Sequence, residues 1–111
     1  MSFDTTPTET ALRLMHDRGI KHCEVLGCEN PAVHAHHAIY KKSHGKHPVK
    51  ELDMDENLQL VCYSCHMVTG VADSFENRLY FWGVQCERYG KPHMIEWHTN
   101  LKLKCKERSY K

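Results

Sequence analysis

The stretch NLQLVCYSCH, residues 57–66, decides how this chain folds. It places a short apolar run, residues 58–61, directly before a Cys-x-x-Cys pair that is followed by a histidine. A short apolar run favours a strand, and the Cys-x-x-Cys spacing is typical of a zinc knuckle. The stretch therefore predicts a strand that leads into a metal-binding turn, with a helix that begins near Cys62.

A second pair of cysteines, Cys23 and Cys28, lies upstream in CEVLGC. Two short cysteine turns can converge on one tetrahedral ion, so the two pairs predict a structural Zn²⁺ held by Cys23, Cys28, Cys62 and Cys65. Because this ion ties together positions about 40 residues apart, its binding free energy would add to the folding free energy of a small domain. The alternatives are four unrelated cysteines, some of them in the core, and a redox pair at Cys62 and Cys65, for which no thioredoxin-like strand and helix are present.

Length and composition set the protein class. The chain has 111 residues, of which 41% are hydrophobic, and a mean hydropathy of −0.63. This length fits a single domain, residues 1–111, with a modest core. No apolar run approaches the roughly 18 residues of a membrane span, and MSFDTTPTET at the N-terminus lacks the regions of a signal peptide. We expect a cytoplasmic protein without a membrane partner, in a compartment where paired cysteines hold metal more often than they form disulfides.

Helical patterns flank the cysteine segment on both sides. Before it, Thr6 as N-cap, Pro7 in the first position and Glu9 in a capping box predict a helix over about residues 7–18. Gly19 would end this helix, and its expected apolar face consists of Ala11, Leu12 and Met15.

After the cysteine segment, apolar side chains at helical spacing predict a helix over about residues 72–89, ended by Gly90. Its expected apolar face consists of Phe75, Leu79, Trp82 and Cys86. Residues 32–39 follow Pro31 and predict a further strand. Residues 93–111 fit a strand as well as a helix, so their fold stays open.

Histidines gather between the two cysteine pairs. HAHH, residues 34–37, holds three of them and precedes Asn57 and the closing His66. The order C-x4-C, HAHH, then NLQLVC-x-x-CH resembles the HNH endonuclease family with its zinc-ribbon frame, over residues 23–69. This resemblance implies a small α+β domain of the ββα-metal type, stabilised by zinc, in a stand-alone protein of the phage or bacterial kind.

The resemblance also implies a role for each matching residue. His36 fits a metal-binding position and His37 the general base. Asn57 fits the residue that steadies the loop carrying the base and, in some members, touches the metal. His66 fits the closing metal ligand, while Gly70 stands where some members have one more, so Asn57, water or a substrate phosphate would complete the coordination. The implied cofactor is one divalent metal, Mg²⁺ or Mn²⁺ ahead of other transition metals, and the implied products are 5′-phosphate and 3′-hydroxyl ends.

The chemistry of histidine agrees with these roles. Phosphodiester hydrolysis needs a base to activate water and a cation to stabilise charge on the phosphate, and an imidazole with a pKa near ~6.5 accepts a proton at neutral pH. Neighbouring strand residues point to opposite faces, so His36 can bind metal while His37 addresses water. His34 shares the face of His36 and either supports the metal ligands by a hydrogen bond or lies half-buried beside the zinc. The alternative is that these histidines are spare zinc ligands or solvated side chains, although four cysteines already satisfy one zinc ion.

Lysines supply the expected contacts with DNA. Lys41, Lys42 and Lys46 follow the histidines in a stretch without acidic residues, and could clamp phosphates beside the cut. The basic tail would add further phosphate contacts through Lys102, Lys104, Lys106 and Arg108. Ordinary solvated charge is the alternative for both. Since nothing resembles a base-reading motif, a protein partner or the structure of the DNA would direct the protein to its target.

The sequence therefore predicts a DNA endonuclease or nickase with one divalent metal on His36 and His66. A non-catalytic zinc-ribbon module that binds nucleic acid or a protein partner is the alternative. A third reading is an assembly factor in which Phe75 and Trp82 form a dimer face. The sequence leaves open the DNA target, nicking against double-strand cutting, the identity of the metal, the biological role, and the choice between monomer and homodimer.

Overall fold

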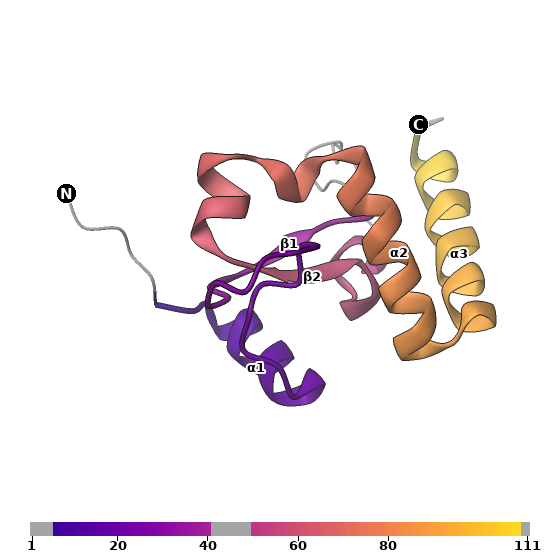
Figure 1. Ribbon diagram of the computed structural model, residues 1–111. Coiled ribbons are helices and arrows are strands. Elements are labelled where there is room, and N and C mark those ends of the chain that lie inside the picture. The colour runs from indigo at the N-terminus through magenta and orange to yellow at the C-terminus, as the bar shows by residue number, and fades with distance from the viewer. Residues whose placement is uncertain (1–5, 41–49, 110–111) are drawn as a thin grey trace.

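The structure of the protein is a computed structural model that describes residues 6–40 and 50–109, without the side chains beyond Lys104. A two-stranded sheet lies at its centre, with helix α1 on one side and helices α2 and α3 on the other (Figure 1). The predicted α+β class is confirmed. None of the described helices is both long and apolar enough to span a bilayer. In chain order the elements are α1 (Glu9–Arg18), β1 (His34–His37), 3₁₀ turns at Lys50–Asp53 and Asp55–Asn57, β2 (Leu58–Val61), a π-helical turn (Ser64–Val68), a 3₁₀ turn (Val71–Asp73), α2 (Phe75–Tyr89) and α3 (Lys91–Ser109).

Strand β2 is buried along its whole length, as its apolar run predicts. Leu58 and Leu60 pack against α1. On the opposite face, Gln59 exchanges two hydrogen bonds with Asn77 of α2, and Val61 packs into the cluster that contains the cysteines. The alternation of a strand therefore ties β2 to α1 on one side and to α2 and the cysteines on the other.

Strand β1 is shorter than the range 32–39 that the sequence predicts. It pairs antiparallel with β2 in a register that sets His36 opposite Gln59 and His37 opposite Leu58. β1 is limited to four residues because β2 has only four residues with which it can pair. The register fixes which histidines share a face, because successive side chains of a strand alternate.

Helix α1 begins two residues later than predicted. Its N-cap is Thr8, whose Oγ1 accepts a hydrogen bond from the Ala11 N–H at 3.2 Å, so the capping role assigned to Thr6 was wrong. The helix ends as predicted at Gly19, which has a φ of 69° and donates its N–H to Met15. Leu14 fills the core, whereas Leu12 is 53% exposed.

Helix α2 begins at Phe75 and not near residue 72, because the Ser74 side chain caps it by accepting from the Asn77 N–H. Its inner face is partly polar: Phe81 is fully buried together with Gln85. Half of the predicted apolar face is confirmed, because Trp82 and Cys86 are partly buried and pack against the core between α2 and α3. The other half is exposed, with Phe75 68% and Leu79 57% accessible.

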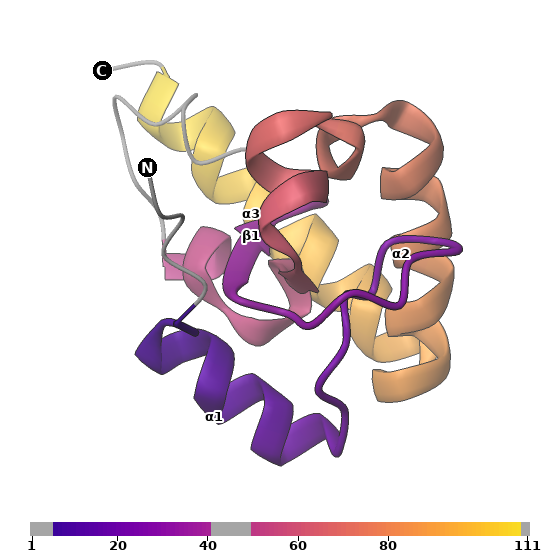
Figure 2. The ribbon, with the colours of Figure 1, turned by 60° about the vertical axis from the view of Figure 1, so that its left-hand side comes forward.

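Residues 91–109 form helix α3, which turns back along α2 after Gly90 (Figure 2). Among the side chains of α3 up to Lys104, Met94, Trp97 and Leu101 are buried, and they pack with Leu52 from the first 3₁₀ turn. Of the two folds that the sequence allowed for the tail, the structure adopts the helix.

A buried ion-pair network joins three parts of the fold. Glu24 directly follows Cys23 and is 7% exposed. Its carboxylate accepts from Arg18 at the end of α1 at 2.6 Å, from Arg88 of α2 at 2.6 Å, and from the Leu60 N–H of β2 at 2.9 Å. Glu24 therefore fixes the cysteine loop to both helices and to the sheet.

Candidate functional site

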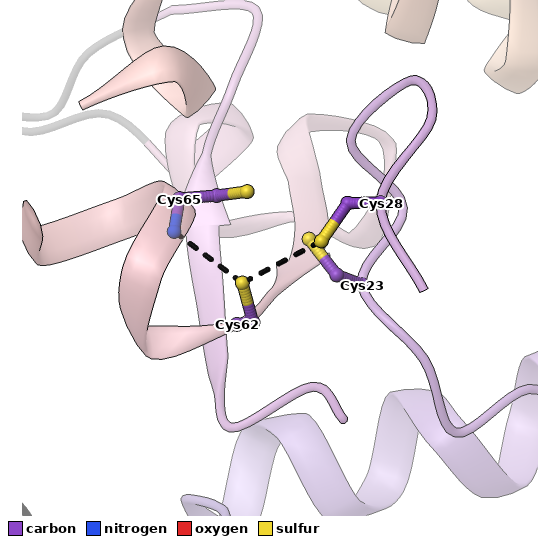
Figure 3. A group of neighbouring side chains, drawn as sticks. All are labelled: Cys23, Cys28, Cys62 and Cys65. Carbon is purple, nitrogen blue, oxygen red and sulfur yellow. Dashed lines mark hydrogen bonds between the residues drawn. The ribbon is translucent and has the colours of Figure 1, made fainter. Parts of the chain in front are cut away.

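The four cysteines converge on one point from two short segments (Figure 3). Their Sγ atoms all lie within 4.8 Å of one another, and the Sγ atoms of Cys28 and Cys62 are 3.7 Å apart. With a Zn–S distance of about 2.3 Å, the sulfurs of a tetrahedral zinc site lie about 3.8 Å apart. The spacing and the donor type therefore fit a structural zinc, and the predicted gathering of Cys23, Cys28, Cys62 and Cys65 is confirmed.

Local backbone geometry explains how each pair converges. In the first pair, the Cys28 N–H donates to Val25 at 3.0 Å, and Gly27 has a φ of 80°, so the turn needs a residue without Cβ. In the second pair, the Cys65 N–H donates to Cys62 Sγ at 3.3 Å. Asn30 adds a side-chain hydrogen bond to the same sulfur at 3.7 Å. Such donors stabilise a thiolate and orient it toward a metal.

The thiols differ in their readiness to ionise. Burial raises the pKa of Cys23 to about 11 and also raises the pKa of Cys65. Burial acts in the same direction on Cys62, but the hydrogen bonds from Cys65 and Asn30 outweigh it and lower its pKa to about 7. Cys62 therefore ionises before Cys23 and Cys65, and a bound cation would favour the thiolate form of both.

A second group of side chains lines a cleft of about 410 Å³ beside the sheet. Its wall includes His34 and His37 of β1, Asp53 of the first 3₁₀ turn, and His66 of the π-helical turn. The His66 ring centroid lies 5.1 Å from that of His34 and 4.9 Å from that of His36. The chain thus brings His66 beside His34 and His36, from a segment that lies far from them in the sequence.

His36 is buried next to His66 and to an acid that the sequence did not suggest. The His36 Nε2 atom lies 3.0 Å from Asp73 Oδ1, yet it makes no hydrogen bond of acceptable geometry within the described part of the chain. Burial lowers the pKa of His36, and the nearby His66 lowers it further, against an opposing effect of Asp73. The His36 Nε2 and Asp73 Oδ1 atoms are close enough either to share a hydrogen or to be neighbouring ligands of one cation.

His66 has its own supporting contact. Its Nδ1 lies 3.1 Å from His34 Nδ1, so one of the two nitrogens must carry the hydrogen. Burial, followed by the neighbouring His34, lowers the pKa of His66. If His66 donates through Nδ1, its Nε2 keeps a lone pair for a metal, as ligating histidines commonly do. Of the two readings of His34, its position favours the one in which it supports His66.

His37 faces away from this pair and is 27% exposed. Its Nε2 lies 2.9 Å from Asp53 Oδ1. A carboxylate acceptor holds the hydrogen on Nε2, which leaves the lone pair on Nδ1. His37 is therefore an accessible base whose tautomer is set by an acid.

Asn57 is fully buried, and its amide is fully used by the backbone. Its Oδ1 accepts from the N–H groups of Ile39 and Tyr40 at 2.9 and 2.8 Å. Its Nδ2 donates to the carbonyls of Tyr40 and Leu52, both at 2.9 Å. With both lone pairs engaged, Asn57 offers none to a metal, and it instead clamps the chain just after His37 to the turn that carries Asp53.

Sequence reasoning missed two acids: Asp53, which lines the cleft, and Asp73, which lies beside His36. Asp53 is one of four acids within residues 51–56, and the sequence gave no sign of which of them would contact His37. Asp73 lies seven residues after His66. The sequence pattern looks for a further ligand only one helical turn after His66, where Gly70 stands. The DNA-binding lysines predicted at positions 41, 42 and 46 lie outside the described residues. Lys104 of the basic tail pairs with Glu51, with Nζ and Oε2 2.6 Å apart.

Comparisons of this chain with protein-family models, with curated proteins and with solved structures each found no match. The interpretation of the cleft therefore rests on its own geometry and on the sequence pattern.

Proposed function

We propose that the protein is a metal-dependent DNA endonuclease or nickase of the HNH type, which hydrolyses phosphodiester bonds to 5′-phosphate and 3′-hydroxyl ends. One observation carries the proposal: β1 and the π-helical turn bring His36 and His66 side by side, while His37, the next residue of β1, is exposed to the adjacent cleft. A zinc-ribbon frame that served only for binding has no need of this arrangement.

The imidazoles of His36 and His66 would hold the divalent metal. Both are buried enough that their pKa values lie below the ordinary value, so both are neutral at physiological pH and have a lone pair to donate. When bound, such an ion supplies positive charge to the phosphate and to the departing 3′-oxygen.

His37 would accept the proton of the attacking water. The contact with Asp53 fixes the hydrogen on Nε2 and stabilises the imidazolium that forms when Nδ1 takes up a proton. Asn57 would act as a positioning residue, because its four backbone hydrogen bonds hold the segment that follows His37. Lys41, Lys42 and Lys46 would bind the flanking phosphates.

A second candidate function is favoured by an apolar groove of about 500 Å³ along α2, lined in part by Phe75, Leu79 and Trp82. An exposed apolar groove is typical of a binding surface. It fits a non-catalytic zinc-ribbon module that binds a partner protein or nucleic acid, and it would also serve as a face between two copies of the chain. Gel filtration separates this last case from a monomer.

The test is cleavage of supercoiled plasmid by zinc-loaded protein with Mg²⁺ or Mn²⁺, with a chelator control. Wild type is expected to relax or linearise the plasmid. His37→Ala is expected to lose about 10²–10⁴-fold in rate, the usual contribution of a general base. The matched control is His16→Ala, because His16 is an exposed histidine of α1 outside the cleft. Plasmid that stays intact with both metals would favour the binding module, and equal cutting by wild type and His37→Ala would rule out His37 as the base.

A further inference from the structure

We infer that Asp73 is the third protein ligand of the metal bound by His36 and His66, and that this centre prefers Mn²⁺ or a similar first-row ion to Mg²⁺. The inference rests on the proposed function and extends it to a residue outside the HNH pattern. It accounts for how the site is completed when Gly70 replaces a ligand and the amide of Asn57 is used elsewhere.

The chain after His66 explains how a carboxylate reaches the site. The π-helical turn ends near Gly70, which has a φ of 70°, a left-handed conformation that breaks the helix. The 3₁₀ turn Val71–Asp73 follows, and it brings the Asp73 Oδ1 atom to 3.0 Å from His36 Nε2. A ligand one regular helical turn after His66 would fall on Gly70, and the interrupted helix supplies Asp73 instead.

The contact with Asp73 has the character of an incomplete metal site. The His36 side chain is 9% exposed, and its Nε2 makes no hydrogen bond of acceptable geometry in the described part of the chain. A shared hydrogen and a shared cation are the two ways in which a buried imidazole nitrogen can be satisfied next to a carboxylate. At 3.0 Å the His36 Nε2 and Asp73 Oδ1 atoms are close enough to be neighbouring ligands of one cation.

The donor atoms also require some movement on binding. Among the described residues, only the four cysteines have three or more donor atoms within 4.8 Å of one another. His36, Asp73 and His66 are therefore looser than the cysteine cluster, and His66 or Asp73 must change rotamer to meet the ion. The exposed side of Asp73, whose side chain is 45% accessible, leaves room for this.

The composition of the donor set predicts which ion binds. Magnesium takes oxygen ligands almost exclusively and keeps several waters. Two imidazoles with one carboxylate suit first-row ions that accept both nitrogen and oxygen. Manganese(II) is the natural probe, because it prefers carboxylate oxygen over thiolate and so does not compete for the cysteine cluster.

The test is Mn²⁺ binding to zinc-loaded protein, measured by the loss of the free-ion EPR signal, without DNA. We expect wild type to bind one Mn²⁺ and Asp73→Asn to bind it at least about 10–100-fold more weakly. Asp73→Glu should recover part of the affinity. Asp17→Asn, which changes an exposed aspartate of α1, should bind as wild type does. Circular dichroism and zinc content must match across the set.

The outcomes separate this inference from the proposed function. Binding that is lost in His36→Ala but unchanged in Asp73→Asn would overturn the role of Asp73 and leave the two-histidine site in place. Binding that depends on Asp73 in a protein that cuts no DNA would support the ligand and overturn the nuclease. Equal affinity for Mg²⁺ and Mn²⁺ in a competition experiment would refute the predicted preference.

Discussion

Replacing Glu24 with glutamine should strongly destabilise the fold. The carboxylate lies 2.6 Å from Arg18, whose side chain is 3% exposed, and 2.6 Å from Arg88, which is 24% exposed. Glutamine keeps the size of the side chain but removes its charge, so the buried guanidinium of Arg18 would lose its counter-ion.

The expected loss follows from the burial of this pair. Breaking a buried ion pair by removing one partner costs about 3–5 kcal/mol. We expect about 3 kcal/mol for Glu24→Gln, since the remaining amide oxygen still accepts one hydrogen bond and Arg88 is partly solvated. A domain of this size has a free energy of unfolding of about 6–17 kcal/mol, so the change removes a large fraction. The melting temperature should fall by about 12 °C or more.

Urea unfolding with saturating zinc measures this loss directly. Glu29→Gln is the matched control, because it makes the same change at an exposed position of the same cysteine loop, and it should stay within about 0.5 kcal/mol of wild type. A loss below about 1 kcal/mol for Glu24→Gln, at unchanged m-value and zinc content, would refute the view that Glu24 joins the cysteine loop to the helices and the sheet.

Three further predictions concern the zinc, the acid limit of stability and the cleft. Cys65→Ser should bind zinc at least about 10-fold more weakly and lose helicity when a chelator is added. If atomic absorption shows full zinc occupancy of this variant in the presence of the chelator, Cys65 is not a zinc ligand. The hydrogen bond from Arg13 lowers the pKa of Asp55, so the stability it contributes is present above the ordinary value near ~4 and is lost as pH falls through the lower folded value. Arg13→Ala should therefore reduce the free energy of unfolding that is lost on acidification by up to about 1 kcal/mol, a small effect because the pair is partly exposed. An unchanged pH dependence of the free energy of unfolding would refute this. Asn57→Ala should cost about 3–5 kcal/mol in urea unfolding, because it unpairs four backbone groups; a milder loss would mean that the backbone re-forms those bonds.

What the sequence could predict was local. The spacing of Cys62 and Cys65 sets a knuckle within one turn, and Leu58–Val61 reads as a strand whatever its partner. Both follow from the covalent spacing of neighbouring residues. The same holds for the end of α1 at Gly19, which depends only on its own backbone conformation.

What the sequence could not predict depends on contacts between distant segments. The inner face of α2 carries Gln85 because that amide donates to carbonyl groups of the turn at residues 55–57. A hydrophobic pattern therefore missed Gln85 and included the exposed Phe75. Glu24 and Asp73 look like ordinary acids until the fold sets Arg18 and His36 beside them. A buried polar group is defined by its partners, and these are not adjacent in the sequence.

The most direct test of hydrolysis at this site is a single-turnover cleavage of DNA in water enriched in ¹⁸O, followed by mass spectrometry of the ends. If His37 activates a water molecule that attacks the phosphorus while the 3′-oxygen departs, each cut should leave one ¹⁸O on a 5′-phosphate and an unlabelled 3′-hydroxyl. Ends that carry a 3′-phosphate, 5′-phosphates without the isotope, or DNA that is not cut at all would contradict this mechanism.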